Sequence, residues 1–258
     1  MNKTEQPNDF MSPIGRLINE LNDQLMIATH IEQSTTALRN TPSLLKTIKK
    51  IPEVNQQTEL MKGINYLEEH TKATIQQTNK ILVDDFSKTN SQILTAMWNS
   101  LLTSIENIQT KLLLKTEVRQ DIIASAKLTK KWQGQLARET DEDELRFFLK
   151  GWKTSGNNIV EYIESKWAYF DLSAPVANDV KAELIEMHQL RNCLVHRAGI
   201  VDKKTAEQAS TLKLTVGQPL TISKSMLLKY HKAAGNYAVS LLCRIPKCKY
   251  TYIKPKSK

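Results

Sequence analysis

The stretch SQILTAMWNSLLTSIENIQTKLL, residues 91–113, carries the strongest structural pattern in the sequence. Its apolar side chains recur every three or four positions, which is the spacing that lines one face of an α-helix. The pattern begins further upstream, and no proline interrupts residues 53–174. The repeating apolar positions are Leu60, Ile64, Leu67, Ile75, Ile81, Ile93, Leu94, Trp98, Leu101, Ile105, Ile108 and Leu112. The sequence therefore predicts long amphipathic helices that pack on one another, and an all-α fold class.

The composition of the 258 residues excludes several classes of protein. Only 8 Gly and 8 Pro are present, which excludes collagen and low-complexity disorder and argues against a many-stranded β-sandwich. Three cysteines cannot form a disulfide framework, so a reducing compartment is expected. No apolar run approaches the ~20 residues of a membrane span, and the first residues are too polar for a signal peptide. We expect a cytoplasmic protein without a membrane partner.

The positive charge is concentrated at the C-terminus. The chain has 36 Lys and Arg against 27 Asp and Glu, a net charge of +9, and residues 242–258 contain six cations and no acid. Tyr250 and Tyr252 lie between these cations, a mixture that suits RNA through phosphate contacts and base stacking. Lys247, Lys249 and Lys254 are therefore candidate RNA-binding residues. The alternative is a basic terminus that only aids solubility.

The sequence divides into three parts. Residues 1–88 are predicted to be a helical extension with a scaffold or sensor role, residues 89–245 a helical domain, and residues 246–258 a basic tail. Within the extension, Ser12 and Pro13 predict a helix start, and Pro42 predicts the end of that helix.

The helical domain shows its own start and stop signals. Acidic residues after Thr140 predict a capped helix that continues to about Trp167. The remaining signals predict a helix from Pro175 to His196, a left-handed cap at Gly199, a small β-hairpin within residues 212–222, and a last helix capped by Ser223.

Residues 187–199, MHQLRNCLVHRAG, hold the candidate site. On a helix, Arg191 lies at the edge of the apolar stripe, while Asn192 and His196 are i, i+4 neighbours on an adjoining face. The stripe itself consists of Val180, Leu184, Met187, Leu190 and Leu194. A cation at the margin of a core, beside an amide and an imidazole, predicts an anion site. The alternative is that Arg and His near a helix C-terminus only stabilise the helix dipole.

The run from Arg191 to His196 resembles the R-x(4–6)-H motif of the HEPN superfamily. The resemblance covers roughly residues 90–245, is strongest over 176–242, and does not extend to residues 1–85. It implies an up-and-down four-helix core and, in many members, a metal-independent endoribonuclease that acts as a dimer. Such members often serve as toxins or antiviral, abortive-infection effectors. By position, Arg191 and His196 correspond to the catalytic pair and Asn192 to the supporting polar residue.

The chemistry of RNA cleavage suits these residue types. Cleavage without a metal needs a base for the 2′-hydroxyl, an acid for the 5′-oxygen and positive charge near the phosphorane, and it leaves 2′,3′-cyclic phosphate ends. Histidine transfers protons near neutral pH, and the planar fork of arginine matches phosphate oxygens. One imidazole does not easily serve both oxygens, so a homodimer that joins two copies of His196 is expected. We also expect Arg197 to contact RNA, no cofactor, and a cognate antitoxin or defence-system partner.

Other functions stay open at this point. A catalytically inactive HEPN-like module that binds RNA, nucleotide or a partner protein is the main alternative, and a helical scaffold with a purely structural motif is another. Cys193 and His196 form a conceivable nucleophile and base, although no third group is visible to orient them. His188 and His196 are about 12 Å apart along a helix, too far to share one metal ion, so no metal site is expected.

Overall fold

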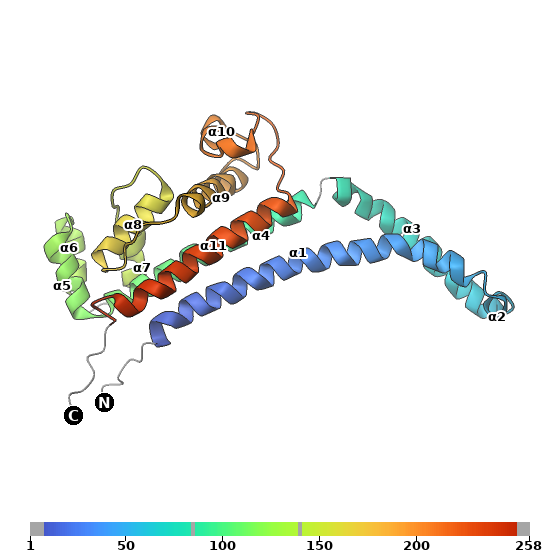
Figure 1. Cartoon of the computed structure of the whole chain (residues 1–258), viewed down its shortest axis with the longest axis horizontal. Helices are drawn as coiled ribbons and strands as arrows, with labels where there is room; N and C mark the ends of the chain where they lie inside the picture. Colours follow the sequence, from blue (N-terminus) through green and yellow to red (C-terminus); the bar gives the residue numbers. More distant parts are fainter. Residues whose placement is uncertain (1–7, 84–85, 139–140, 252–258) are drawn as a thin grey trace, which may run out of the picture.

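The protein is all-α in its computed structural model, which describes residues 8–83, 86–138 and 141–251 (Figure 1). The helices are α1 (Asn8–Ile48), α2 (Pro52–Asn55), α3 (Thr58–Val83), α4 (Ser87–Leu113), α5 (Thr116–Ser125), α6 (Lys130–Ala137), α7 (Glu142–Gly151), α8 (Ile159–Tyr169), α9 (Asn178–His196), α10 (Lys203–Gln208) and α11 (Lys224–Arg244). Single 3₁₀ turns cover Ser210–Leu212 and Ile245–Lys247. Among the described residues, no helix is long and apolar enough to cross a membrane.

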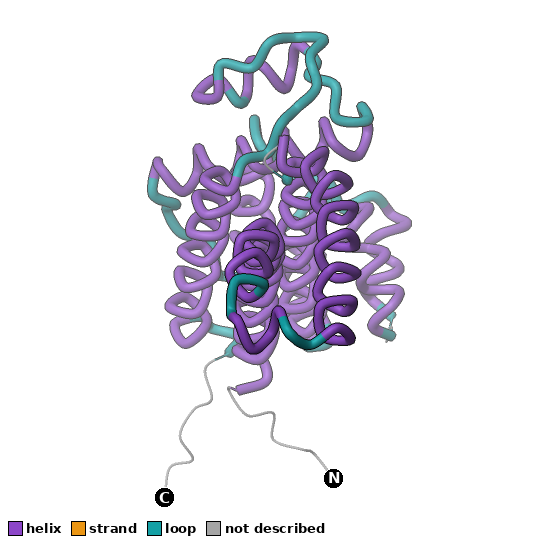
Figure 2. The backbone as a smooth tube through the Cα atoms, turned by 90° about the vertical axis from the view of Figure 1, so that its right-hand side faces the viewer, coloured by secondary structure: helices purple, strands orange, loops and turns teal. Residues whose placement is uncertain are grey.

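The centre of the molecule is a bundle in which α4 contacts α1, α9 and α11. Figure 2 shows that helices, joined by loops, make up this part of the chain, and that α10 and its loops lie at the edge beyond α9. The largest fully buried side chains include Trp98, Trp167, Tyr230, Tyr237, Phe148 and Phe170. These aromatic side chains fill the core, so they are not a platform for stacking nucleic-acid bases.

The N-terminal helix belongs partly to this bundle. Ile14, Leu17 and Leu21 are buried in the same core as α4 and α11, whereas the second half of α1 extends away from the bundle and packs on α3 (Figure 1). The prediction that Pro42 ends this helix is wrong, because α1 continues through Pro42 to Ile48. Buried side chains on both sides of Pro42, at Thr35 and Leu45, hold the helix in place despite the backbone hydrogen bond that a proline removes.

The Ser12–Pro13 start signal is also misplaced. Both residues lie inside α1, whose described part begins at Asn8. Pro13 is the sixth described residue of α1, beyond the first four N–H groups that have no partner within a helix, so it removes one backbone hydrogen bond. The sequence signal therefore lies near the N-terminus of α1 but does not identify its first residue.

The predicted helix from Thr140 to Trp167 is two helices. Thr140 lies outside the described residues, and Asp141 is the N-cap of α7, accepting a hydrogen bond from the N–H of Glu144 at 2.9 Å. Helix α7 ends at Gly151, and Asn158 caps α8 by accepting from the N–H of Glu161 at 3.0 Å. The loop and the second N-cap separate the two helices, so a single continuous helix does not form. The helix predicted from Pro175 ends at His196 as expected, but α9 begins at Asn178.

The predicted β-hairpin within residues 212–222 does not form. Instead, residues 217–220 pair with residues 199–201, just after α9, in a single antiparallel bridge between Ile200 and Pro219. The N–H of Leu220 donates to the carbonyl of Gly199 at 2.7 Å, and the N–H of Val201 donates to Gln218 at 3.0 Å. The last helix begins as predicted, because the hydroxyl of Ser223 accepts from the N–H of Met226.

Candidate active site at the end of α9

A sharp turn ends α9 and leaves its last residue exposed. The N–H groups of Arg197 and Gly199 both donate to the carbonyl of Cys193, at 3.0 and 3.1 Å. Ala198 and Gly199 both adopt left-handed conformations, with φ of 50° and 76°. The predicted left-handed cap at Gly199 is confirmed, and Ala198 shares it. The turn directs the chain away immediately after His196, so the imidazole lies at the surface.

The three residues predicted to form the site lie in contact. Nη1 of Arg191 is 3.2 Å from Nε2 of His196 and 3.3 Å from Oδ1 of Asn192, to which it donates. A guanidinium only donates hydrogen bonds, so Nε2 of His196 is the acceptor and is unprotonated in this arrangement. Helix α9 alone therefore positions an arginine, an amide and an accessible imidazole within one cluster.

His188, which lies one helical turn before Asn192 on α9, is a fourth member of this cluster. Because Oδ1 of Asn192 accepts from Arg191, its Nδ2 donates to Nε2 of His188, 3.0 Å away. The His188 ring also packs on Trp98 of α4, with ring centroids 5.0 Å apart. Burial, followed by the charges of Arg191 and Lys204, lowers the pKa of His188 to about 4. The imidazole is neutral at physiological pH and holds Asn192 in place.

The guanidinium of Arg191 has unused hydrogen-bonding capacity. Its Nε is buried and has no hydrogen-bond partner among the described residues, and the same holds for Nδ1 of His188. The groups that Arg191 does contact, Asn192 and His196, carry no negative charge in this arrangement. A partly buried cation without a carboxylate partner is costly, which is characteristic of a site that binds an external anion.

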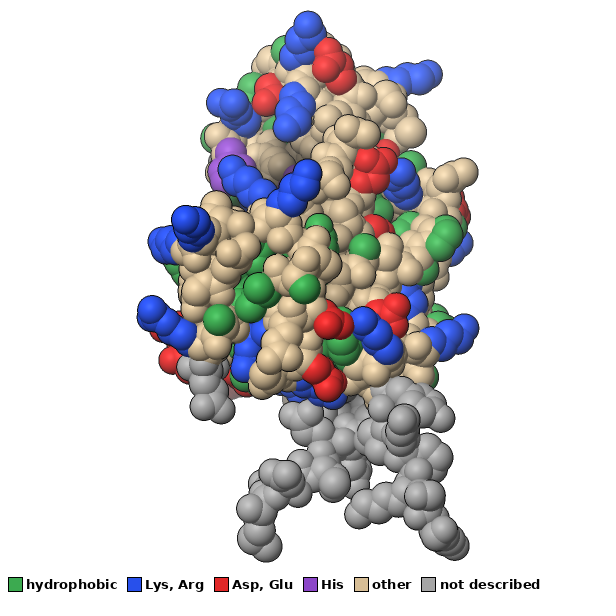
Figure 3. Space-filling model, turned by 90° about the vertical axis from the view of Figure 1, so that its left-hand side faces the viewer, with side chains coloured by type: hydrophobic (Ala, Val, Ile, Leu, Met, Phe, Trp, Pro, Cys, Tyr) green, Lys and Arg blue, Asp and Glu red, His purple; other side chains and the backbone are tan. Residues whose placement is uncertain are grey.

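Further cations surround the end of α9. Arg197, a predicted RNA contact, has a side chain 64% exposed, with Nε 3.4 Å from the carboxylate of Asp202. Asp202 in turn caps α10, which carries Lys203 and Lys204. Figure 3 shows Lys and Arg side chains beside a histidine in the upper part of one face of the molecule, with some Asp and Glu side chains among them. The residues that follow α9 thus bring three cations, Arg197, Lys203 and Lys204, and the carboxylate of Asp202 to this end of the helix.

The thiol of Cys193 is structural. Its side chain is 1% exposed, and Sγ donates to the carbonyl of Ile200 at 3.2 Å. Burial raises the pKa of the thiol, which opposes formation of the thiolate that a cysteine nucleophile requires. This environment contradicts the alternative of a Cys193 nucleophile activated by His196.

The basic C-terminal residues are partly packed against the fold. Tyr250 is 6% exposed and donates its hydroxyl to Asp121 at 2.6 Å, so its ring is not available for base stacking. Nζ of Lys249 contacts the same carboxylate at 2.9 Å. Lys247 is exposed, and Lys254 lies outside the described residues, as does Tyr252. The described part of the predicted cationic tail, residues 246–251, thus packs against the fold, and we call it the docked segment.

This docked segment is far from the motif in the same chain. The end of α9 is tied to Leu220, just before α11, whereas Lys247 and Lys249 follow the other end of α11. A helix of 21 residues is about 30 Å long. Lys247 and Lys249, two of the predicted RNA contacts, therefore lie far from Arg191 and His196 of the same chain.

Comparison of the chain with protein-family models, curated proteins and solved structures gave no match. Among the described residues, no group of three or more His, Cys, Asp or Glu side chains lies close enough to hold a metal ion.

Proposed function

We propose that this protein is a metal-independent endoribonuclease of the HEPN type, with Arg191 and His196 as its catalytic pair. The observation that carries the proposal is the 3.2 Å contact between Nη1 of Arg191 and Nε2 of His196 at the exposed end of α9. An arginine that has no carboxylate partner among the described residues, beside an accessible, unprotonated imidazole nitrogen, supplies two of the three functions that RNA cleavage needs, the positive charge and the base.

In the proposed reaction, the guanidinium of Arg191 binds a non-bridging oxygen of the scissile phosphate and stabilises the charge of the phosphorane. His196 removes the proton of the 2′-hydroxyl, whose oxygen attacks phosphorus while the bond to the 5′-oxygen breaks. The 5′-oxygen then takes up a proton, which leaves 2′,3′-cyclic phosphate and 5′-hydroxyl ends. Asn192 is a positioning residue, because it orients Arg191 through its Oδ1.

The second proton-transfer group must come from elsewhere than His188. That imidazole is half-buried against Trp98, bonds to Asn192 and stays neutral down to about pH 4, so it is a poor acid at neutral pH. We propose a homodimer in which two α9 helices face each other and two copies of His196 share one cleft. Val195 and Ile200, which are 47% and 43% exposed beside the motif, supply apolar contact area for such an interface.

The proposed biological setting is a toxin or antiviral effector in the cytoplasm, held inactive by an antitoxin or another defence-system partner. The net charge of +9 suits an RNA substrate, because cations release counterions when they neutralise phosphates. A second candidate is an inactive HEPN-like module that binds RNA, nucleotide or a partner protein. A single chain has one accessible imidazole in the Arg191 cluster, whereas cleavage needs two proton-transfer groups. A protein that does not dimerise would therefore favour this second candidate.

The test compares RNA cleavage by the wild type, His196→Ala, Arg191→Lys and a matched control, His30→Ala, which removes an exposed imidazole from α1. With excess EDTA, we expect the wild type and His30→Ala to cleave single-stranded RNA equally well. His196→Ala and Arg191→Lys should be at least about 100-fold slower, since proton transfer and a bidentate phosphate contact are lost.

Thermal unfolding of the same variants separates catalysis from folding. His196→Ala should unfold at the wild-type temperature, because an exposed imidazole at a helix end contributes little to stability. A variant that melts many degrees lower would show that His196 is a structural residue. RNA that binds to the wild type without being cleaved would select the inactive binding module instead.

A further inference from the structure

A surface hollow of about 470 Å³ opens beside the end of α9. Its walls come from the first turns of α4, the end of α9 and the extended residues before α11. The residues that matter most are Lys88, Ser91, Gln92, Leu194, Pro219 and Leu220. Its volume lies within the roughly 300–1,000 Å³ typical of small-molecule sites. We call this hollow the Lys88 pocket.

The Lys88 pocket adjoins the candidate active site. Leu194, in its wall, lies three residues after Arg191 and therefore on the same face of α9, one turn further on. The left-handed turn after His196 contributes Ala198 and Gly199 to the same wall. A ligand in the pocket and a phosphate on Arg191 would thus be bound by consecutive turns of one chain segment.

The lining of the pocket suits a nucleobase with its phosphate. Pro219 is exposed and Leu194 is half-buried, and above the buried Leu220 they provide an apolar surface for the flat face of a base. Gln92 is exposed, and its amide has no hydrogen-bond partner among the described residues, so it can donate to and accept from the edge of a base. Lys88 is exposed and forms no ion pair within the described part of the chain, so its ammonium is free to contact a phosphate.

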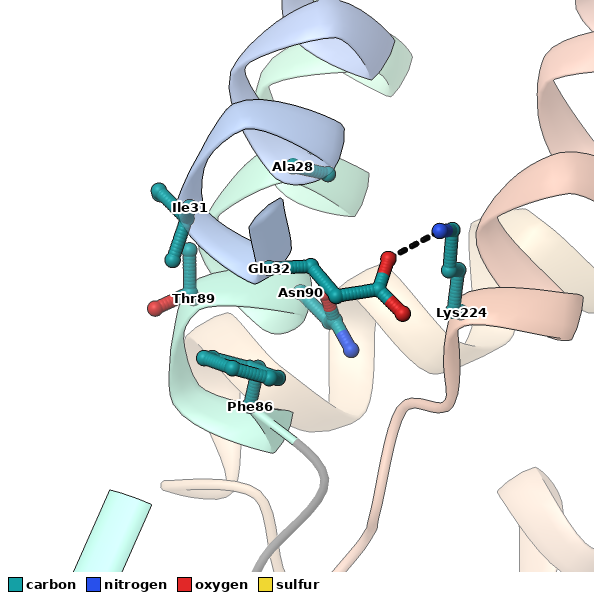
Figure 4. A pocket seen from close by; sticks show the side chains of 7 residues that line it. All are labelled: Ala28, Ile31, Glu32, Phe86, Thr89, Asn90 and Lys224. Carbon is teal, nitrogen blue, oxygen red and sulfur yellow. Dashed lines mark hydrogen bonds and ion pairs between the residues drawn. The ribbon is translucent and has the colours of Figure 1, made fainter. Parts of the chain in front are cut away.

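Two other hollows do not share these properties. A hollow of about 540 Å³ beside α5 and α8 is lined by Lys249 and by the carboxylates of Asp121 and Asp171. The ammonium of Lys249 already contacts Asp121 at 2.9 Å, so the carboxylates oppose phosphate binding there. A cavity between α1, α4 and α11 has a volume of only about 20 Å³, room for one water molecule. Figure 4 shows Glu32 and Lys224 pointing toward each other across that cavity as an ion pair, which further restricts it.

We propose that the Lys88 pocket binds one nucleotide of single-stranded RNA adjacent to the scissile phosphate and so contributes to the choice of cleavage site. This inference rests on the proposed function for its substrate, but the pocket itself is testable without RNA cleavage. Single-stranded RNA is the fitting class, because its unstacked bases expose both a face for apolar contact and an edge for an amide.

The experiment titrates the full-length protein with each of the four nucleoside 5′-monophosphates while the backbone amide signals of Gly199 and Leu220 are followed by NMR. We expect saturable shifts of both signals at millimolar concentrations. Lys88→Glu should weaken binding about tenfold, since a charge-assisted contact to phosphate is replaced by repulsion. Lys232→Glu, which makes the same charge change at an exposed position of α11, should leave the affinity within about twofold.

Gln92→Ala tests recognition of the base. This exposed substitution should alter the order of affinity among the four nucleotides, and the same change should appear in the cleavage-site preference of the enzyme. Inorganic phosphate is the control ligand. Identical shifts with inorganic phosphate and with nucleotides would overturn the pocket as a nucleobase site, and so would the absence of shifts at Gly199 and Leu220.

The two proposals fail in different ways. If nucleotides bind with the expected dependence on Lys88 and Gln92 but the wild type cleaves no RNA, the pocket stands and the endoribonuclease proposal is wrong. If the wild type cleaves RNA but no nucleotide shifts Gly199 or Leu220, the Lys88 pocket is wrong and the endoribonuclease proposal stands.

Discussion

The half-buried imidazole of His188 should make the stability of this protein depend on pH. Its pKa is lowered from 6.5 to about 4 in the folded protein, chiefly by burial and then by the charges of Arg191 and Lys204. In the unfolded chain the pKa returns to about 6.5. Between these two values the unfolded chain binds a proton that the folded protein does not. Stability is therefore fully present above about pH 6.5 and decreases as the pH falls toward 4.

The size of the effect follows from the gap between the two pKa values. At 1.36 kcal/mol for each pH unit, the gap corresponds to about 3 kcal/mol once the pH is below 4. At pH 5 the loss is roughly 2 kcal/mol relative to pH 8. Domains of ordinary stability have a free energy of unfolding of about 5–15 kcal/mol, so a loss of this size is readily measured.

The assay is urea unfolding at pH 8 and pH 5, followed by tryptophan fluorescence. His188→Gln removes the titrating group but keeps an oxygen that can accept the hydrogen bond of Asn192. We expect the wild type to lose about 2 kcal/mol more than His188→Gln between the two pH values. Glu68 and Glu161, whose ion pairs with lysines hold their pKa at about 2, are common to both proteins and do not alter the difference.

The matched control is His30→Gln, which replaces an exposed imidazole on α1. Its stability should show the same pH dependence as the wild type. If His188→Gln and the wild type lose stability equally between pH 8 and pH 5, the His188 imidazole is not buried in its neutral form. The arrangement of Asn192 and Trp98 around it would then be wrong as well.

Three further outcomes are expected. Cleavage should persist in EDTA and leave 2′,3′-cyclic phosphate ends, identified by mass spectrometry of the products; a strict requirement for added magnesium would refute the mechanism. A dimer with one wild-type and one His196→Ala subunit, purified with two tags, should lose most of its activity, whereas half-activity would mean that each subunit works alone. Deleting residues 247–258 should lower stability by about 3–5 kcal/mol in urea unfolding, because Cys248 and Tyr250 leave the core; unchanged stability would contradict their packing.

Local signals in the sequence were sufficient to predict several elements. The apolar repeat in residues 91–113 predicted α4, whose Leu94, Trp98 and Leu101 are each at most 1% exposed. The cap at Ser223 and the end of α9 at His196 were also predicted, because each depends on residues within one turn of the boundary. An interaction within one turn involves only neighbouring residues, so it can be predicted from the local sequence.

The errors arose where distant residues decide the local structure. The alternation in residues 212–222 predicted a hairpin, but the partner of residues 217–220 is the segment that follows α9. Asn90 of α4 also donates to the carbonyl of Ile222 at 2.8 Å, which holds this strand-like segment against the bundle. Period-2 alternation indicates an extended chain with one buried face, but it does not identify the partner.

The candidate site shows the same division between local and distant causes. The i, i+4 spacing of His188 and Asn192 was visible in the sequence, but the role of His188 depends on Trp98, 90 residues earlier in the chain. Packing on Trp98 keeps His188 neutral, a neutral His188 accepts the amide of Asn192, and the remaining oxygen of Asn192 accepts from Arg191. The orientation of the guanidinium toward His196 thus depends on the contact between α4 and α9. A substitution at Trp98 is therefore expected to disturb the proposed chemistry as well as the core.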